Sequence, residues 1–196
     1  MNPLPAPGVW RPAHHEVMRF PVLLRALAWL LCAGLLGPAA QADTRAGGEP
    51  APADRCDLPA FRASLLQAVN QARAEPRQCG SQSMPAAAPL RWERRLFAAA
   101  RGHSADMARL DYMSHTGRDG RSVAQRVLAQ GYPWSVVGEN LAAGPQTVEE
   151  VVDGWLASPG HCVNLMKRDF AEVAVACVQR EGTTWGRYWT MVLGRE

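Results

Sequence analysis

The sequence predicts an α+β fold in which helices come first along the chain and an antiparallel hairpin closes it. Four segments before residue 160 repeat apolar residues every three or four positions, as amphipathic helices do. In residues 172–196 the apolar period changes from 3.6 to 2, which is typical of strands. Helices followed by a hairpin favour separate α and β layers over the alternating order of a parallel sheet.

Residues 1–42 are interpreted as a secretory signal peptide. An apolar run at 26–37 follows two arginines and leads to Ala40-Gln41-Ala42, whose small residues are typical of a cleavage site. The run is shorter than the roughly 20 residues that a membrane span needs. We therefore expect cleavage after Ala42 and a secreted or periplasmic product, and Met18 offers a second start for a leader of ordinary length.

Residues 43–57 mix Ala, Gly, Pro and charged residues without a period, and they are predicted to form a flexible tether. Residues 58–196 are then long enough for a single folded domain. The whole chain has 21 Lys and Arg against 18 Asp and Glu, a net charge of +3. So small an excess predicts no basic surface for nucleic acid or an anionic membrane.

The first helix is expected from Leu58, with Asp57 as its cap and Pro76 at its end. Its apolar positions share one helical face: Phe61, Leu65, Val69 and Ala72. A second helix is expected over residues 92–110. Its apolar face includes Leu96, Ala99, His103, Met107 and Leu110.

Two further helices are predicted to begin with a capping box, in which a hydroxyl and a Gln or Glu three residues later satisfy the first backbone N–H groups. The pairs are Ser122 with Gln125 and Thr147 with Glu150. The sequence Ser158-Pro159-Gly160 is expected to end the last helix.

The strands are expected where apolar residues alternate or run together. Residues 173–178 and 188–193 are predicted to form a hairpin, with the polar segment 179–186 as its turn. Residues 136–142 are predicted to be a third strand.

The cysteines beyond the leader are expected to form two disulfides, because an even number in an oxidising compartment tends to pair. They are Cys56, Cys79, Cys162 and Cys177. Short loops favour Cys56–Cys79 and Cys162–Cys177, although a helix fills most of the first interval, so residues 76–79 would have to fold back along it. Zinc binding by these cysteines is the weaker alternative, because the chain lacks a C-x-x-C pair.

Imidazole chemistry beyond the leader depends on His103, His115 and His161. His103 lies on the apolar face of a helix and is interpreted as structural, whereas the other two are expected in loops after helix ends. Glu139 interrupts an apolar segment, so its carboxylate needs an imidazolium, a metal ion or backbone donors as a partner. Two imidazoles and a carboxylate suit Zn²⁺ with an open position for water. Alternatively, Glu139 joins two loops through backbone N–H groups.

Several catalytic motifs are absent from the sequence: H-E-x-x-H, G-x-S-x-G, the P-loop and the Rossmann glycine pattern. The order of the motifs that are present resembles the CAP superfamily, also called SCP-like, of cysteine-rich secretory proteins, antigen 5 and pathogenesis-related proteins, and especially its bacterial secreted branch. These motifs are Asn70-Gln71-Ala72-Arg73, Ser114-His115-Thr116, Gly138-Glu139-Asn140-Leu141, Trp155 to His161 and Tyr188-Trp189-Thr190. The resemblance covers about residues 60–195 and implies an α-β-α sandwich, with a three-stranded antiparallel sheet between helical layers.

The resemblance also implies a cleft in which His115, Glu139 and His161 hold one divalent metal, usually zinc. The fourth ligand of the family, an acid, falls here on Ser158. Glu172 is a possible substitute for it.

The function that the resemblance implies first is a secreted, non-enzymatic binding module. Its cleft would hold a divalent metal and a small apolar or lipid ligand, and the protein would be a monomer. One alternative is a zinc-dependent hydrolase in which Glu139 is the general base for a metal-bound water. The other is a purely structural or adhesive extracellular domain.

Overall fold

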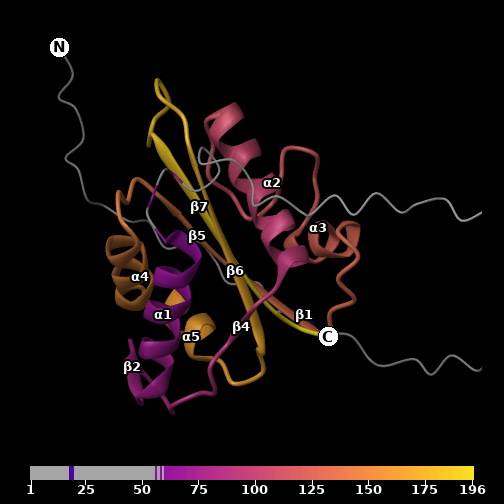
Figure 1. Ribbon diagram of the computed structural model, residues 1–196. Helices are drawn as coiled ribbons and strands as arrows, with labels where there is room; N and C mark the ends of the chain where they lie inside the picture. The colour runs from indigo at the N-terminus through magenta and orange to yellow at the C-terminus, as the bar shows by residue number, and fades with distance from the viewer. Residues whose placement is uncertain (1–17, 20–55, 57, 59) are drawn as a thin grey trace, which may run out of the picture.

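The computed structural model describes residues 18–19, 56, 58 and 60–196. A sheet of five strands in the order β1-β5-β7-β6-β4 crosses the middle of the molecule (Figure 1). Its three long strands pair antiparallel: β5 (Val136–Ala143), β7 (Arg187–Arg195) and β6 (Glu172–Gln179). Two short strands extend the edges, β1 (Met18–Arg19) beside β5 and β4 (Arg91–Trp92) parallel to β6. The expected three-stranded antiparallel sheet is therefore the centre of a wider one.

Helices cover both faces of this sheet, as the sandwich prediction requires (Figure 1). On one side lie α1 (Phe61–Ala74), α4 (Val148–Ala157) and α5 (Pro159–Met166). On the other lie α2 (Arg94–Leu110) and α3 (Val123–Ala129). Strand β6 shows why its sequence is apolar throughout: Val173 and Val175 pack with α1, α4 and α5, whereas Ala174 and Ala176 pack with α2 and α3.

The helix ends follow the predicted signals in part. The capping box of Ser122 and Gln125 is complete at α3. At α4, Thr147 accepts the bond from the Glu150 backbone, but the Glu150 carboxylate accepts from the N–H of Gln146, so only half of the expected box forms. Helix α1 begins at Phe61 after Ala60, which gives no side-chain cap, and not at Leu58.

The sequence Ser158-Pro159-Gly160 both ends a helix and begins one. Helix α4 stops at Ala157, and α5 starts at once with Pro159 in its first turn, where a missing N–H costs no helical hydrogen bond. His161 therefore lies on a helix and not in the expected loop.

The structure contains two disulfides, but the expected pairing is wrong. Cys56 bonds to Cys177 and Cys79 bonds to Cys162, across 121 and 83 residues, instead of Cys56–Cys79 and Cys162–Cys177. Helix α1 lies between Cys56 and Cys79, and its 14 residues span about 21 Å. The Cα atoms of bonded Cys56 and Cys177 are only 5.6 Å apart. Cys162 instead lies against the hairpin of β2 (Arg77–Cys79) and β3 (Gln82–Met84).

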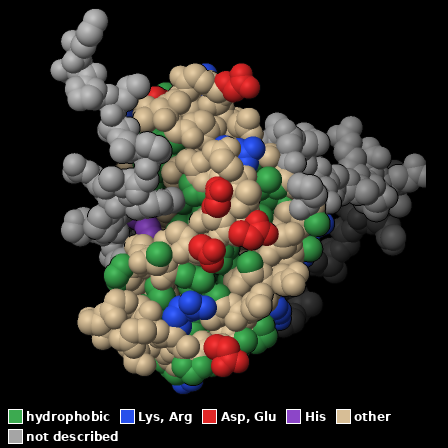
Figure 2. Space-filling model, turned by 90° about the vertical axis from the view of Figure 1, so that its left-hand side faces the viewer, with side chains coloured by type: hydrophobic (Ala, Val, Ile, Leu, Met, Phe, Trp, Pro, Cys, Tyr) green, Lys and Arg blue, Asp and Glu red, His purple; other side chains and the backbone are tan. Residues whose placement is uncertain are grey.

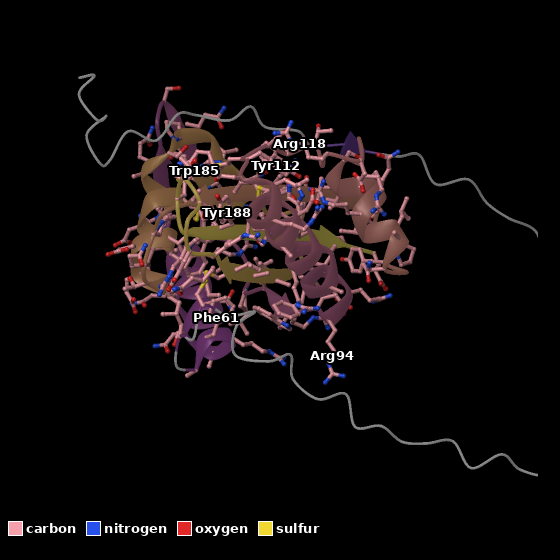
Figure 3. All side chains as sticks on the ribbon, turned by 90° about the horizontal axis from the view of Figure 1, so that it is seen from above. Phe61, Arg94, Tyr112, Arg118, Trp185 and Tyr188 are labelled. Carbon is pink, nitrogen blue, oxygen red and sulfur yellow. A yellow bond between two sulfur atoms is a disulfide. The ribbon has the colours of Figure 1, made fainter. Side chains whose placement is uncertain are left out.

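The tip of the β6–β7 hairpin rests on the end of α2. Asp111, just after α2, accepts hydrogen bonds from Thr184 at 2.9 and 2.8 Å and from the Tyr188 hydroxyl. Figure 3 shows the aromatic side chains at this end of the molecule, where Arg118 lies 4.5 Å from the centre of the Tyr112 ring. These contacts fix the start of the segment that leads from α2 to α3.

The predicted leader and tether fall outside the described residues, apart from Met18, Arg19 and Cys56. Of the helices that the structure describes, none combines the length and apolar composition that crossing a membrane requires. On the face shown in Figure 2, acidic and basic side chains are interspersed among apolar ones.

Candidate functional site

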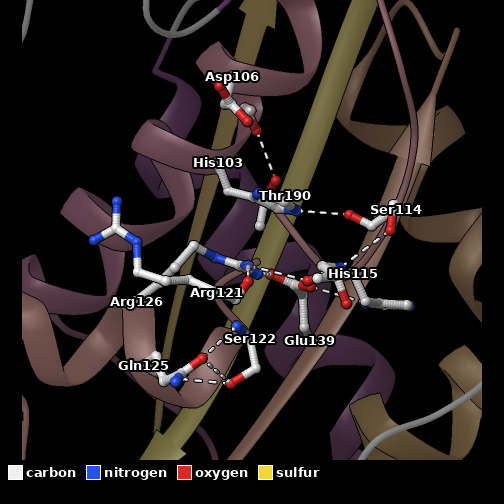
Figure 4. Close-up of polar contacts among 12 residues, drawn as sticks. His103, Asp106, Ser114, His115, Arg121, Ser122, Gln125, Arg126, Glu139 and Thr190 are labelled. Carbon is white, nitrogen blue, oxygen red and sulfur yellow. Dashed lines mark hydrogen bonds and ion pairs between the residues drawn. The ribbon is translucent and has the colours of Figure 1, made fainter. Parts of the chain in front are cut away.

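The Glu139 carboxylate lies in the middle of β5 and is 3% exposed. Its Oε1 accepts a hydrogen bond from His115 Nδ1 at 2.8 Å, and its Oε2 accepts one from Arg126 Nη2 at 2.5 Å (Figure 4). The partner that a buried carboxylate needs is thus an imidazole together with a guanidinium. We call His115, Glu139 and Arg126 the Glu139 trio.

The environment of Glu139 keeps it ionised. Burial favours the neutral acid, but the hydrogen bond from His115 and the charge of Arg126 outweigh burial, so the pKa of Glu139 lies below its ordinary value. The carboxylate therefore accepts hydrogen bonds and has no proton to donate at neutral pH.

Arg126 is the member of the site that the sequence analysis missed. It lies on α3, is 8% exposed, and also donates from Nη1 to the backbone oxygens of His115 at 3.0 Å and Arg121 at 2.8 Å. A signal was present, because Arg126 falls three residues after Val123 and beside Val127, within the apolar register of the predicted helix.

One ring nitrogen of His115 has no hydrogen-bond partner among the described residues. Because Nδ1 faces a carboxylate, Nδ1 carries the proton, and in the neutral ring Nε2 is the acceptor. Nε2 is buried and has no hydrogen-bond partner among the described residues.

His103 is structural, as expected, and it positions the loop before His115. Its Nε2 lies 2.8 Å from the backbone oxygen of Ser114, which can only accept, so Nε2 is the donor (Figure 4). Burial is the main cause that lowers the pKa of His103. The ring is therefore neutral at neutral pH.

Each residue of Gly138-Glu139-Asn140 has a separate role in β5. A Cβ at Gly138 would lie 2.8 Å from the Phe170 ring. The Glu139 side chain faces the α3 side of the sheet, and Asn140 faces α5, where its amide donates to the backbone oxygen of His161 at 3.0 Å. Asn164 on α5 completes the connection by donating to the Glu139 backbone oxygen at 3.1 Å.

The expected metal ligands do not form a three-ligand centre as arranged. Both Glu139 oxygens are hydrogen-bonded, and Glu139 contacts α3 whereas the backbone of His161 lies against the other face of β5. The described residues contain no group of three or more His, Cys, Asp and Glu side chains that could hold a metal ion. A metal held by His115, Glu139 and His161 therefore stays a prediction.

The two residues considered for the fourth ligand lie elsewhere. Ser158 joins α4 to α5, and its backbone oxygen accepts from Cys162. The Glu172 carboxylate accepts from the Tyr132 hydroxyl at 2.6 Å and lies 3.4 Å from Arg91, two strands away from β5.

A pocket of about 190 Å³ lies between α2, the loop after it and α3, and Arg126 is the one member of the Glu139 trio that lines it. It includes Arg126 and His103 in its wall, together with the charged residues Asp106, Asp119 and Arg121. These charges already pair, Arg121 with Asp119 at 2.6 Å and Asp106 with Arg109 at 2.6 Å.

The α-β-α sandwich and the motifs around Glu139 are those of one family of domains. The family model of the cysteine-rich secretory proteins, CAP, matches residues 66–193. The chain belongs to this family.

Relatives come from bacteria. The chain is 33% identical to the Bacillus subtilis (strain 168) protein YkwD over 97 residues, which cover 50% of this chain and 37% of YkwD. It is 32% identical over 88 residues to the B. subtilis membrane protein YlbC, covering 45% of this chain and 25% of YlbC. The chain thus matches only about a third of YkwD and a quarter of YlbC.

A solved structure with the same fold is an extracellular protein containing an SCP domain from Bacillus anthracis str. Ames. It is 26% identical with a TM-score of 0.50, and the match covers 56% of this chain and 35% of that protein.

Proposed function

We propose that the protein is a secreted, non-enzymatic binding module of the CAP family whose ligand contacts His115. The observation that carries this proposal is the buried Nε2 of His115, an acceptor with no partner among the described residues. A buried polar atom without a hydrogen bond is costly, so a ligand that donates an O–H or N–H to Nε2 gains free energy on binding.

The charge balance of the site favours an uncharged or largely apolar ligand. Glu139 and Arg126 neutralise each other at 2.5 Å, and His115 Nδ1 bonds the same carboxylate. The site therefore has no unbalanced charge that calls for an ion as its occupant. A small apolar or lipid molecule with one hydrogen-bond donor has the matching chemistry.

The hydrolase alternative has less support. A general base must accept a proton from water, but each oxygen of Glu139 already accepts a hydrogen bond from a side chain and the pKa of Glu139 is lowered. Ser104 donates to Thr190 at 2.8 Å inside the core, and the four described cysteines are in disulfides. One observation does favour it: a carboxylate behind an imidazole is also the arrangement of a catalytic base.

Secretion is supported by the two disulfides and by the extracellular SCP-domain protein that shares the fold. The proposed route is a signal peptide over residues 1–42, cleaved after Ala42. The mass of the exported protein tests this route, since it should correspond to a chain that begins at Asp43.

The proposed function is tested by equilibrium binding of a dansyl-labelled fatty alcohol, which is uncharged and carries an O–H donor, to the wild type and to His115→Ala. We expect saturable binding that weakens about tenfold or more in the variant. Leu128→Ala is the control, because Leu128 is 53% exposed on α3 and should leave binding unchanged.

The same proteins are assayed for turnover of a p-nitrophenyl ester. Turnover that His115→Ala abolishes would make the protein a hydrolase and contradict the proposal. Binding that is absent, or equal in wild type and His115→Ala, would favour the structural or adhesive role.

A further inference from the structure

We propose that the guanidinium of Arg126 supplies the positive charge that balances Glu139 in this site. Glu139 then positions His115 and is not a metal ligand. The site would then bind its ligand without a divalent metal. This inference rests on the proposed binding at His115 and deepens it.

The contacts of Arg126 carry the first step. Its guanidinium bonds the Glu139 carboxylate at 2.5 Å and the His115 backbone oxygen at 3.0 Å. One side chain thus both balances the charge of Glu139 and fixes the backbone at His115. A metal bound through Glu139 would lie beside the positive charge of this guanidinium in a buried region, where like charges repel strongly.

The contacts of Glu139 carry the second step. An ionised carboxylate can only accept, so it selects the His115 form with the proton on Nδ1 and the free electron pair on Nε2. The hydrogen bond made by one ring nitrogen sets the role of the other, so the carboxylate acts through His115. Arg126 keeps the carboxylate ionised and fixes its second oxygen. Arg126 thus positions Glu139, and Glu139 in turn positions the His115 ring.

The position of α3 carries the third step. The capping box at Ser122 starts the helix one turn before Arg126, and Arg126 also bonds the backbone oxygen of Arg121 at 2.8 Å. The guanidinium is therefore anchored to its own helix start as well as to Glu139.

The first experiment is titration of Zn²⁺ into chelator-stripped wild type, Glu139→Gln and Arg126→Gln, followed by calorimetry and thermal unfolding. We expect no micromolar binding in the wild type and no loss of any weaker binding in Glu139→Gln. Arg126→Gln should gain stabilisation by Zn²⁺, because Glu139 then lacks its cation. Arg121→Gln is the control: this neighbour is about half exposed, pairs with Asp119 and should behave as wild type.

The second experiment reads the His115 ring directly by ¹⁵N NMR of histidine-labelled protein without metal. We expect the Nδ1–H form in the wild type and in Arg126→Lys, which keeps the charge. Arg126→Gln should show a mixture of the two ring forms. If Arg126→Gln does not fold, the ring form of His115 is compared between the wild type and Arg126→Lys instead.

Micromolar or tighter Zn²⁺ binding by the wild type that His115→Ala abolishes would overturn this inference, because the site would then hold a divalent metal. So would an Nε2–H ring in the metal-free wild type. Either result leaves the proposed function standing if the fatty-alcohol probe still binds and His115→Ala still weakens that binding about tenfold or more. Loss of the proposed function is seen separately, as ester turnover or as probe binding that does not depend on His115.

Discussion

Arg73 is a buried cation that is satisfied by backbone oxygens. It is fully buried at the end of α1, and its guanidinium donates to the oxygens of Ala88, Leu165 and Lys167 at 2.7–3.0 Å. Burial lowers its pKa to about 10, so it stays charged at neutral pH. The oxygens at the end of α5 carry the negative end of the helix dipole, which suits a cation. Arg73 therefore joins α1, the Pro-rich loop and α5, and this explains its place in the Asn70–Arg73 motif.

Glu139 predicts an acid-dependent loss of stability. Its folded pKa lies below the ordinary value of 4.5, so its stabilising contribution is complete above about pH 4.5 and is lost as the pH falls through the folded pKa. Near pH 7, Glu139→Gln should lower the free energy of unfolding by about 3 kcal/mol, because Arg126 keeps its charge without a partner. The difference between wild type and variant should shrink below about pH 4.5.

Urea unfolding of both proteins at several pH values measures this difference. The difference between the two proteins cancels the pH-dependent contributions of other carboxylates with lowered pKa values, such as Asp106 and Glu93, because both proteins contain them. A difference that is constant from neutral to acidic pH would show that Glu139 is not ionised in the folded protein.

At the scale of single elements, α3 connects local sequence signals to the site. It has only seven residues, too few for a stable helix in isolation. The Ser122 backbone N–H donates to the Gln125 side chain at 2.9 Å, and the Ser122 hydroxyl accepts from the Gln125 N–H. This capping box, together with the packing of Val123 and Val127, holds the helix that carries Arg126.

Ser122→Ala should therefore destabilise the protein by about 1 kcal/mol, the usual effect of losing an N-cap. It should also weaken ligand binding at His115, since Arg126 is anchored in the same turn. Thr147→Ala at α4 is the matched control: it removes a similar cap, at a comparable loss in urea unfolding, on the other side of the sheet. Equal effects of the two variants on binding would contradict a specific link between α3 and the site.

Helix α5 shows how one sequence signal supports two outcomes. Ser158-Pro159-Gly160 is a sound reason to end a helix, yet proline is also favoured in a helical first turn. The hairpin β2–β3 decides the outcome by packing on this start, because a Cβ at Gly80 would lie 2.8 Å from the Pro159 side chain. The Cys79–Cys162 bond then fixes the hairpin to α5 one residue after His161.

At the scale of the whole molecule, the two disulfides connect parts that are remote in sequence. Cys56 joins the start of the domain to the middle of the sheet, and Cys79 joins the small hairpin to α5. Both close long loops, which in the chain-entropy model gives each bond more stabilisation than the short loops expected from sequence.

The double variant Cys79→Ser, Cys162→Ser should lower the free energy of unfolding by about 4 kcal/mol, as expected for a closed loop of this length. Urea unfolding measures the loss, with wild type in reductant as the comparison. Non-reducing peptide mapping checks the pairing, and a peptide that joins Cys162 to Cys177 would contradict it. Alkylation of any of the four cysteines without prior reduction would contradict the bond in which that cysteine takes part.

The sequence by itself predicted the α+β class, the three long strands, the capped start of α3 and the buried carboxylate at Glu139. These features depend on residues within a few positions of one another, so periodicity, caps and composition are enough to predict them. The motif order also predicted the CAP family, which the match to residues 66–193 confirms.

Only the tertiary structure decided the cysteine partners, the start of α5 beside His161, and the presence of Arg126 against Glu139. In each case the deciding contact joins segments that meet through packing, across 13 residues for Arg126 and Glu139 and 121 for Cys56 and Cys177. Loop length alone favoured nearby cysteines, but a rigid helix between two residues sets their separation and overrides it. Local chemistry showed that Glu139 needed a partner, and only the packing of α3 against β5 supplied Arg126 as that partner.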